Sequence, residues 1–134
     1  MICLLDTHIL LWSLTDSPAL SKKARDLILC EENTICYSVL SLWEIELKHA
    51  LRPVEIPFTA KDISGLCKEA GINLLPLEED SIFRLSSLRR PETAPPHKDP
   101  FDRMLICQAV SKNIFFLTHD AKLRDYGLKN IIEV

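Results

Sequence analysis

Short apolar segments alternate with longer helix-like segments along nearly the whole chain, and this alternation constrains the fold more than any other feature. Apolar runs typical of buried strands are expected at residues 2–5, 34–38, 72–77, 114–117 and 130–134. Helical patterns fall at residues 8–14, 19–33, 39–51, 59–70, 78–88, 99–112 and 121–126. Strands that alternate with helices predict an α/β fold in which helices cover both faces of a parallel sheet.

The whole chain, residues 1–134, is expected to form one domain. With 47% hydrophobic residues the chain can bury a single core, and it has no repeat or linker. No apolar run approaches the ~20 residues of a membrane span, so we expect a cytoplasmic protein. The five cysteines have no C-x-x-C spacing and lie in or beside apolar segments. This favours buried, reduced thiols over a zinc site.

The stretch "HKDPFDRML" (97–105) places two acids at the start of an apolar helix. Asp99 is a good N-cap, and Pro100 then falls at the first helical position, where its missing N–H costs nothing. Capping does not explain Asp102, since any acid in the first turn would gain the favourable interaction with the helix dipole. Asp102 is therefore a candidate for chemistry, and Asp99 a secondary candidate that could be only a cap.

Two further acids follow expected strands. Asp6 comes directly after the run "CLL", and Asp120 comes two residues after Thr118, which follows "FFL". Each could instead cap the helix that comes next. In parallel sheets the ligand crevice lies outside the carboxyl ends of the strands, so the two acids are expected to lie near one another.

Glu44 is expected to point towards the core. It falls inside the apolar stripe of its helix, which consists of Leu40, Trp43, Leu47 and Leu51. A carboxylate in such a position is costly unless it is paired or bound to a metal. The alternative is an ordinary surface ion pair between Glu44 and Lys48, one turn later.

Converging carboxylates without paired His or Cys ligands favour a hard cation, Mg²⁺, for which Mn²⁺ can substitute. Such a site can activate water and neutralise the charge of a phosphate under attack, which would let a chain of net charge −3 act on a polyanion. Thr7 and Thr118 could steady the neighbouring carboxylates, and Arg103, in a local basic cluster with Lys98, could contact phosphate. The single histidines at 97 and 119 are expected at the surface or beside the site rather than as ligands.

Five segments resemble a known family: "LLDTHILLW", "SVLSLWEIELK", "LPLEEDS", "HKDPFDRMLICQA" and "FLTHDAKLRDYG". In this order they resemble PIN-domain ribonuclease toxins of the VapC type, the toxins of type II toxin–antitoxin systems. The resemblance implies a three-layer α/β/α domain with a central parallel sheet of four to five strands, Mg²⁺-dependent RNA cleavage, a homodimer and a cognate antitoxin. It also implies four catalytic, metal-binding acids: Asp6, Glu44, Asp102 and Asp120, with Asp6 and Asp102 as the principal ligands. The segment "HALRPVEIP" departs from the glycine-bearing turn that is frequent in relatives.

Two other functions fit the sequence less well. An aspartyl-phosphate phosphotransferase would use Asp6 as nucleophile and a second acid two residues later, where this chain has His8. A non-catalytic signalling module could use the acids as a regulatory cation site. A receiver-like module would need an acid at the end of a central strand, and "INLLPL" ends without one.

Overall fold

Five parallel strands form one central sheet in the computed structural model, which describes residues 1–134. The strands are β1 (Ile2–Leu5), β2 (Thr34–Ser38), β3 (Asn73–Leu75), β4 (Phe115–Thr118) and β5 (Ile131–Glu133). Their order in the sheet is β3-β2-β1-β4-β5, so the chain builds the sheet outwards from β1 in one direction and then returns to its other side. The α/β prediction with a parallel sheet is confirmed.

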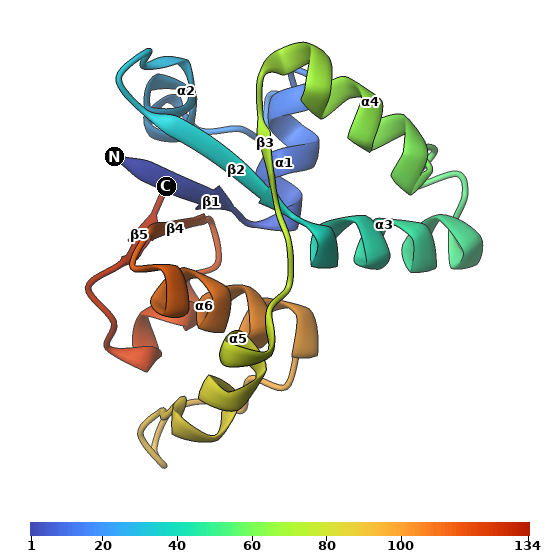
Figure 1. The fold of residues 1–134 in the computed structure, drawn as a ribbon. Coiled ribbons are helices and arrows are strands. Elements are labelled where there is room, and N and C mark those ends of the chain that lie inside the picture. Colours follow the sequence, from blue (N-terminus) through green and yellow to red (C-terminus); the bar gives the residue numbers. More distant parts are fainter.

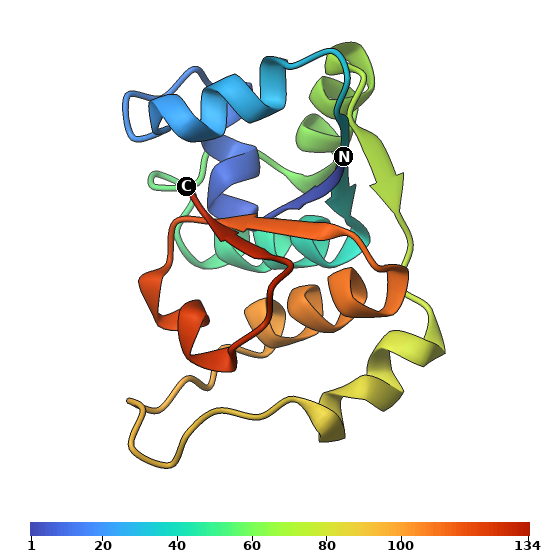
Figure 2. The same cartoon turned by 90° about the vertical axis from the view of Figure 1, so that its left-hand side faces the viewer.

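Helices cover both faces of this sheet (Figures 1 and 2). One layer contains α1 (Thr7–Leu14), α2 (Lys22–Leu29) and α4 (Ala60–Ala70), and α3 (Val39–Leu51) begins directly at the end of β2. The other layer contains α5 (Glu79–Phe83), the 3₁₀ helix η1 (Arg84–Ser87), α6 (Pro100–Lys112) and the 3₁₀ helix η2 (Ala121–Tyr126). The fold is therefore a three-layer α/β/α arrangement.

Each face of the sheet has its own hydrophobic core. Along β1, Cys3 and Leu5 belong to the core under α1, α2 and α4, while Leu4 belongs to the core under α6. On β4 the same alternation places Leu117 on the first face and Phe116 on the second. Because both faces of the central strands are buried, their sequences are continuously apolar.

The expected helices over 19–33 and 78–88 are wrong in extent. The first is only Lys22–Leu29: the Ser21 side chain accepts a hydrogen bond from the N–H of Ala24, and the backbone turns extended at Cys30. The second is divided into α5 and the tighter helix η1. The helix expected at 121–126 is likewise of the 3₁₀ type. Local capping and tight turns, which apolar periodicity does not report, set these ends.

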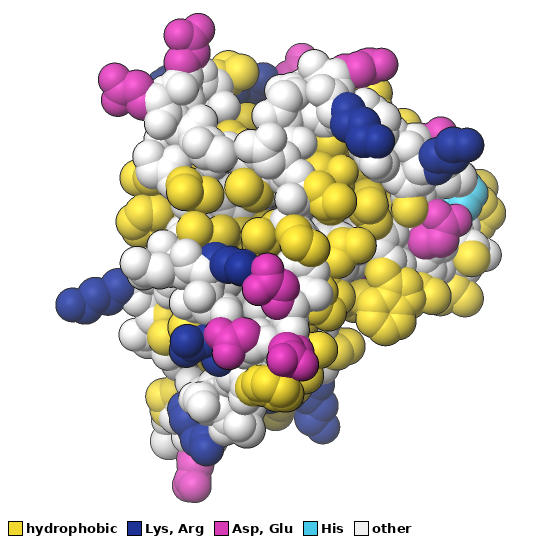
Figure 3. Space-filling view, in the orientation of Figure 1, with side chains coloured by type: hydrophobic (Ala, Val, Ile, Leu, Met, Phe, Trp, Pro, Cys, Tyr) yellow, Lys and Arg dark blue, Asp and Glu magenta, His cyan; other side chains and the backbone are white.

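The expected core-facing stripe of α3 is also wrong. Leu40 is buried, but Leu47 is exposed, Trp43 is 58% exposed and Leu51 is 79% exposed. The helix instead packs inwards through Leu40, Ser41, Glu44 and Ile45. The inward face of the helix is therefore part polar, and beyond Leu40 the apolar stripe faces outwards. Figure 3 shows hydrophobic side chains gathered over β3 and along the α3 side of the molecule.

All five cysteines are free thiols. Four are buried as expected, but Cys30 is exposed because it caps the carboxyl end of α2, beyond the buried face of that helix. None of the helices combines the length and the apolar character needed to cross a membrane.

Candidate metal centre

An acidic cavity of about 340 Å³ lies beyond the carboxyl ends of β1 and β4. These strands are neighbours in the sheet, and β1 is where the strand order reverses. In open α/β sheets such a switch point is the usual place for a ligand, because the connections leave the two strand ends in opposite directions. The residues that line the cavity are Asp6, His8, Glu44, Asp99, Asp102, His119, Asp120 and Ala121.

The ends of β1 and β4 are joined through the Thr118 hydroxyl. It donates to Asp6 Oδ2 at 2.6 Å and accepts from the Asp120 N–H at 3.1 Å. The Asp6 side chain makes no capping bond to α1, so the capping alternative for Asp6 is wrong. Asp120 does cap η2, since its Oδ1 accepts from the Lys122 N–H at 2.9 Å. This cap uses one carboxylate oxygen, so capping and a place in the cavity are compatible for Asp120.

Glu44 reaches the same cavity from α3 and is buried. Its Oε1 accepts from the Thr7 hydroxyl at 2.7 Å, and Thr7 in turn lies 2.9 Å from the Ser41 hydroxyl. Because Thr7 donates to Glu44, Ser41 is the donor to Thr7. The ion pair with Lys48 is also present, at 2.5 Å from Oε2. Burial and pairing with Lys48, which the sequence presented as alternatives, occur together.

The amino end of α6 supplies two more acids. Asp99 is the N-cap, and its Oδ1 accepts from the N–H groups of Phe101 and Asp102 at 2.9 and 3.2 Å. Asp102, one turn into the helix, accepts no hydrogen bond and points into the cavity. Asp99 also lines the cavity, so capping does not exclude it from the site. Arg103 does not line the cavity.

The acids are costly to keep charged together. Burial, followed by the negative charges of Asp6, Asp99, Glu44 and Asp120, raises the pKa of Asp102 to about 8. Burial also raises the pKa of Asp6, and the hydrogen bond from Thr118 opposes that rise. Without a cation the cavity therefore favours protonated carboxyls, because like charges in a desolvated site repel.

His97 lies closer to the acids than the sequence suggested. Its Nε2 is 3.5 Å from Asp102 Oδ2, and its Nδ1 is 2.7 Å from the Tyr126 hydroxyl. Burial lowers the pKa of this imidazole and raises that of Asp102, so desolvation favours the neutral form of each group. His119 is exposed at the rim, where its ring lies 4.6 Å from that of Trp12. No sequence pattern identifies His97, because its contact with Tyr126 joins residues 29 positions apart.

The donor set fits a hard divalent cation. The cavity contains five carboxylates, from the ends of β1 and β4, from α3 and from the start of α6, and no cysteine. The pKa values of two of these, Asp6 and Asp102, are raised, and a bound cation would lower them by stabilising the charged carboxylates. Oxygen-rich sites of this kind suit Mg²⁺ or Mn²⁺.

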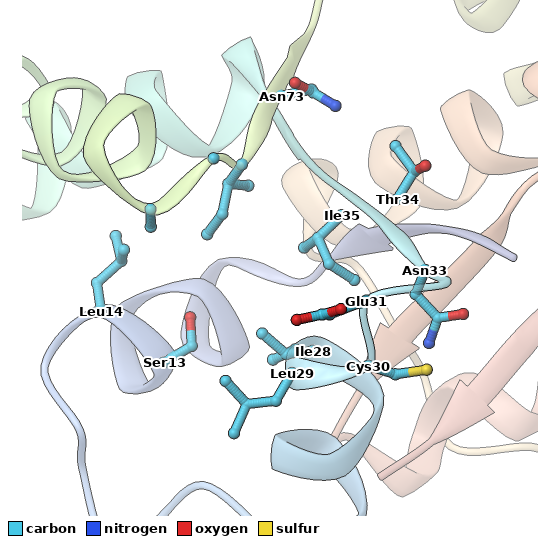
Figure 4. Close-up of a pocket in the computed structure, with 13 residues that line it drawn as sticks. Ser13, Leu14, Ile28, Leu29, Cys30, Glu31, Asn33, Thr34, Ile35 and Asn73 are labelled. Carbon is cyan, nitrogen blue, oxygen red and sulfur yellow. The ribbon is translucent and has the colours of Figure 1, made fainter.

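A larger cavity, of about 490 Å³, lies at the amino ends of β2 and β3. Figure 4 shows it between α1, α2 and the start of these strands, lined by Leu14, Ile28, Ile35 and their neighbours. Its only ionisable groups are Glu31 and the thiol of Cys30. This cavity offers no convergent set of ligands, so size does not make it the better candidate.

A family model and several solved structures match this chain. The family model for the PIN domain matches residues 3–129. A chain of VapBC2 from Rickettsia felis, crystallised with a DNA fragment of its promoter, has a TM-score of 0.69 and 17% identity, covering 100% of this chain and 98% of that one. A chain of VapBC-1 from nontypeable Haemophilus influenzae has a TM-score of 0.68 and 17% identity, and the match covers 99% of this chain and 98% of that one. A chain of FitAcB from Neisseria gonorrhoeae has a TM-score of 0.62 and 18% identity, and the match covers 99% of this chain and 97% of that one. No curated protein matches the sequence.

Proposed function

The chain belongs to the PIN domain family, and we propose that it is a metal-dependent endoribonuclease, the toxin of a type II toxin–antitoxin pair. The observation that carries this proposal is the convergence of Asp6, Glu44, Asp102 and Asp120 on one cavity at the switch point of the sheet. Four separate elements supply these acids, an arrangement that capping alone does not require.

In the proposed site the acids bind the metal, and two threonines orient them. Asp6 and Asp102 are the proposed principal ligands of Mg²⁺, with Mn²⁺ as a substitute, and Glu44 and Asp120 complete the site. The bound cation would lower the pKa of a water molecule and neutralise charge on the phosphate under attack. Thr118 fixes the Asp6 carboxylate, and Thr7 fixes that of Glu44. Lys48 pairs with Oε2 of Glu44 and balances part of the negative charge of the site.

The proposed substrate is RNA. The chain has a net charge of −3, so a polyanion would be drawn to local positive charge rather than to the whole surface. Lys98 and Arg103 flank the acidic helix start in sequence and are proposed to contact the phosphates. Arg103 would act outside the cavity, since it does not line it.

The proposed partners are a cognate antitoxin and a second copy of the chain. The solved structures with the same fold include a toxin–antitoxin complex from Klebsiella pneumoniae, with a TM-score of 0.58 and 16% identity, covering 98% of this chain and 99% of that one. The exposed apolar residues of α3, among them Trp43 and Leu51, leave a surface that a partner could cover. A neighbouring groove of about 250 Å³ between Trp43, Ile82 and Phe101 adds to this surface.

Incubation of the purified protein with a structured RNA tests the function. We expect cleavage with Mg²⁺, loss of cleavage in EDTA, and recovery when Mg²⁺ is returned in excess. The variant Asp102→Asn, prepared in parallel, should be inactive although folded. Cleavage that survives EDTA, or an equally active variant, would show a contaminating nuclease or another site. Metal binding without cleavage of any RNA would favour the regulatory cation module instead.

A further inference from the structure

His97 places an unsatisfied nitrogen beside the proposed metal ligands. Its side chain is 6% exposed, and Nε2 has no hydrogen-bond partner. One ligand atom each from His97, Asp102 and Asp120 all lie within 4.8 Å of one another. A buried polar atom without a partner is uncommon in native proteins, because its desolvation is not compensated.

The imidazole ring is held from its other side. Nδ1 is 2.7 Å from the Tyr126 hydroxyl, and the two rings meet edge to face at 5.6 Å between centroids. The Arg90 guanidinium lies 5.3 Å from the centroid of the Tyr126 ring and 3.0 Å from Asp125 Oδ2. The loop before α6 is thereby tied to η2, the helix that Asp120 caps. His97 is consequently fixed, and its free nitrogen is directed at Asp102.

The contact between Nδ1 and Tyr126 is compatible with the tautomer that leaves Nε2 as a lone pair. If Nε2 carried the proton, it would face Asp102 at 3.5 Å, beyond the usual length of an N–H···O bond. If Nδ1 carries the proton, it donates to the Tyr126 oxygen at 2.7 Å. Histidines that bind metals have this pattern, in which the second ring nitrogen donates to a fixed acceptor.

We propose that His97 is a ligand of the divalent cation through Nε2, beside Asp102 and Asp120, and that Tyr126 is the positioning residue that orients its ring. This inference rests on the proposed function in one respect, namely that the acids bind a divalent cation. A nitrogen ligand favours transition-metal ions over Mg²⁺. The site should therefore prefer Mn²⁺ to Mg²⁺ more strongly than a site built from carboxylates alone.

Pulsed electron paramagnetic resonance of bound Mn²⁺ tests the ligand directly. We expect electron spin echo modulation from a directly bound ¹⁴N in the wild-type protein, replaced by ¹⁵N modulation when only the histidines are labelled with ¹⁵N. The signal should disappear in His97→Asn. It should persist in His8→Asn and His119→Asn, the matched controls, because these two histidines line the acidic cavity but do not belong to the group formed by His97, Asp102 and Asp120.

Calorimetric titration supplies the second readout. Removal of a partner that orients a metal ligand typically changes metal affinity about 10–100-fold, so Tyr126→Phe should weaken Mn²⁺ binding about tenfold and keep the ¹⁴N signal. His97→Asn should weaken Mn²⁺ binding more than Mg²⁺ binding and so reduce the preference for Mn²⁺.

The outcomes separate the two proposals. Mn²⁺ binding that requires Asp102 but shows no histidine nitrogen in the wild-type protein would overturn the role of His97 and leave the acidic metal site intact. A nitrogen signal that is lost in His119→Asn instead would assign the ligand to His119 and also overturn it. Absence of Mn²⁺ binding to the wild-type protein would overturn both this inference and the proposed function.

Discussion

Each end of the central sheet has a cavity, but only the cavity at the carboxyl end is lined by a cluster of acids. The amino end has the larger cavity, about 490 Å³, with mostly apolar or small side chains around it. The carboxyl end has about 340 Å³ lined by five carboxylates and two histidines. The larger space is a gap between α1, α2 and two strand ends, whereas the smaller one collects ionisable side chains from four elements. Convergence of titratable groups at a switch point, rather than volume, marks the place for chemistry.

The largest expected effect is on RNA cleavage, which should depend on acids at the carboxyl end of the sheet and not on the amino-end cavity. Asp6→Asn should reduce RNA cleavage more than about 100-fold, since loss of even a residue that supports a metal ligand typically costs 10–100-fold. Glu31→Gln, in the amino-end cavity, should leave the rate within about twofold of wild type. Initial rates at saturating Mg²⁺ measure both. A comparable loss in Glu31→Gln would remove the distinction between the two ends.

The metal-free stability of Asp102→Asn sharpens the comparison. The pKa of Asp102 is about 8 in the folded protein and 3.8 as its ordinary value. Between these values the folded state binds a proton that the unfolded state lacks, so its contribution to stability falls as pH rises. Asparagine does not ionise, so Asp102→Asn avoids this loss of stability and should melt at a higher temperature than wild type. The difference between the two melting temperatures should widen from pH 5 to pH 8.

Thermal melting in EDTA at several pH values measures this difference. A gain of about 1 kcal/mol corresponds to roughly 3–6 °C for a domain of this size. Glu31→Gln is the control, and the difference between its melting temperature and that of wild type should stay constant from pH 5 to pH 8. Parallel melting curves for wild type and Asp102→Asn across this pH range would contradict the burial of Asp102 among like charges.

The pair of Glu44 and Lys48 should respond asymmetrically to mutation. The Glu44 side chain is 4% exposed and that of Lys48 is 40% exposed. Lys48→Gln leaves a buried charge without its partner and should destabilise the protein by about 1–2 kcal/mol, less than a fully buried pair. Glu44→Gln leaves only a solvated lysine and should change stability by less than about 1 kcal/mol, but weaken Mn²⁺ binding. Urea unfolding and calorimetry would refute this if Glu44→Gln proved the more destabilising change.

The smallest effect is expected at the cap of α6. Serine caps a helix nearly as well as aspartate, so Asp99→Ser should keep the melting temperature and most of the cleavage activity. Asp102→Ser, three residues along the same helix, should be inactive. The reverse pattern in the two variants would show that Asp99 is a ligand and Asp102 is not.

Much of the fold could be predicted because parallel strands buried on both faces have a distinctive sequence pattern. The run "CLL" before Asp6 is continuously apolar because Leu4 and Leu5 face opposite cores. Helix ends were less predictable, because a single hydrogen bond, such as that from the Ala24 N–H to Ser21, decides them.

The candidate site could be predicted in part, since acids at strand ends are visible in the sequence. The sequence did place Glu44 inwards, but for the wrong reason, because the stripe of Trp43 and Leu51 faces outwards. His97 could not be assigned, because its importance depends on Tyr126 and on the path of a proline-rich loop. These contacts join residues 29 positions apart, and periodicity does not report them.

Paramagnetic mapping with Mn²⁺ is the most direct test that the carboxyl end of the sheet holds the metal centre. In a ¹⁵N-labelled sample, trace Mn²⁺ should first broaden the amide signals of Thr7, His119 and Asp120. Those of Ile28 and Asn73, in the amino-end cavity, should broaden last, and Asp102→Asn should abolish the selective effect. First broadening at the amino end, or selective broadening that Asp102→Asn does not change, would contradict the account.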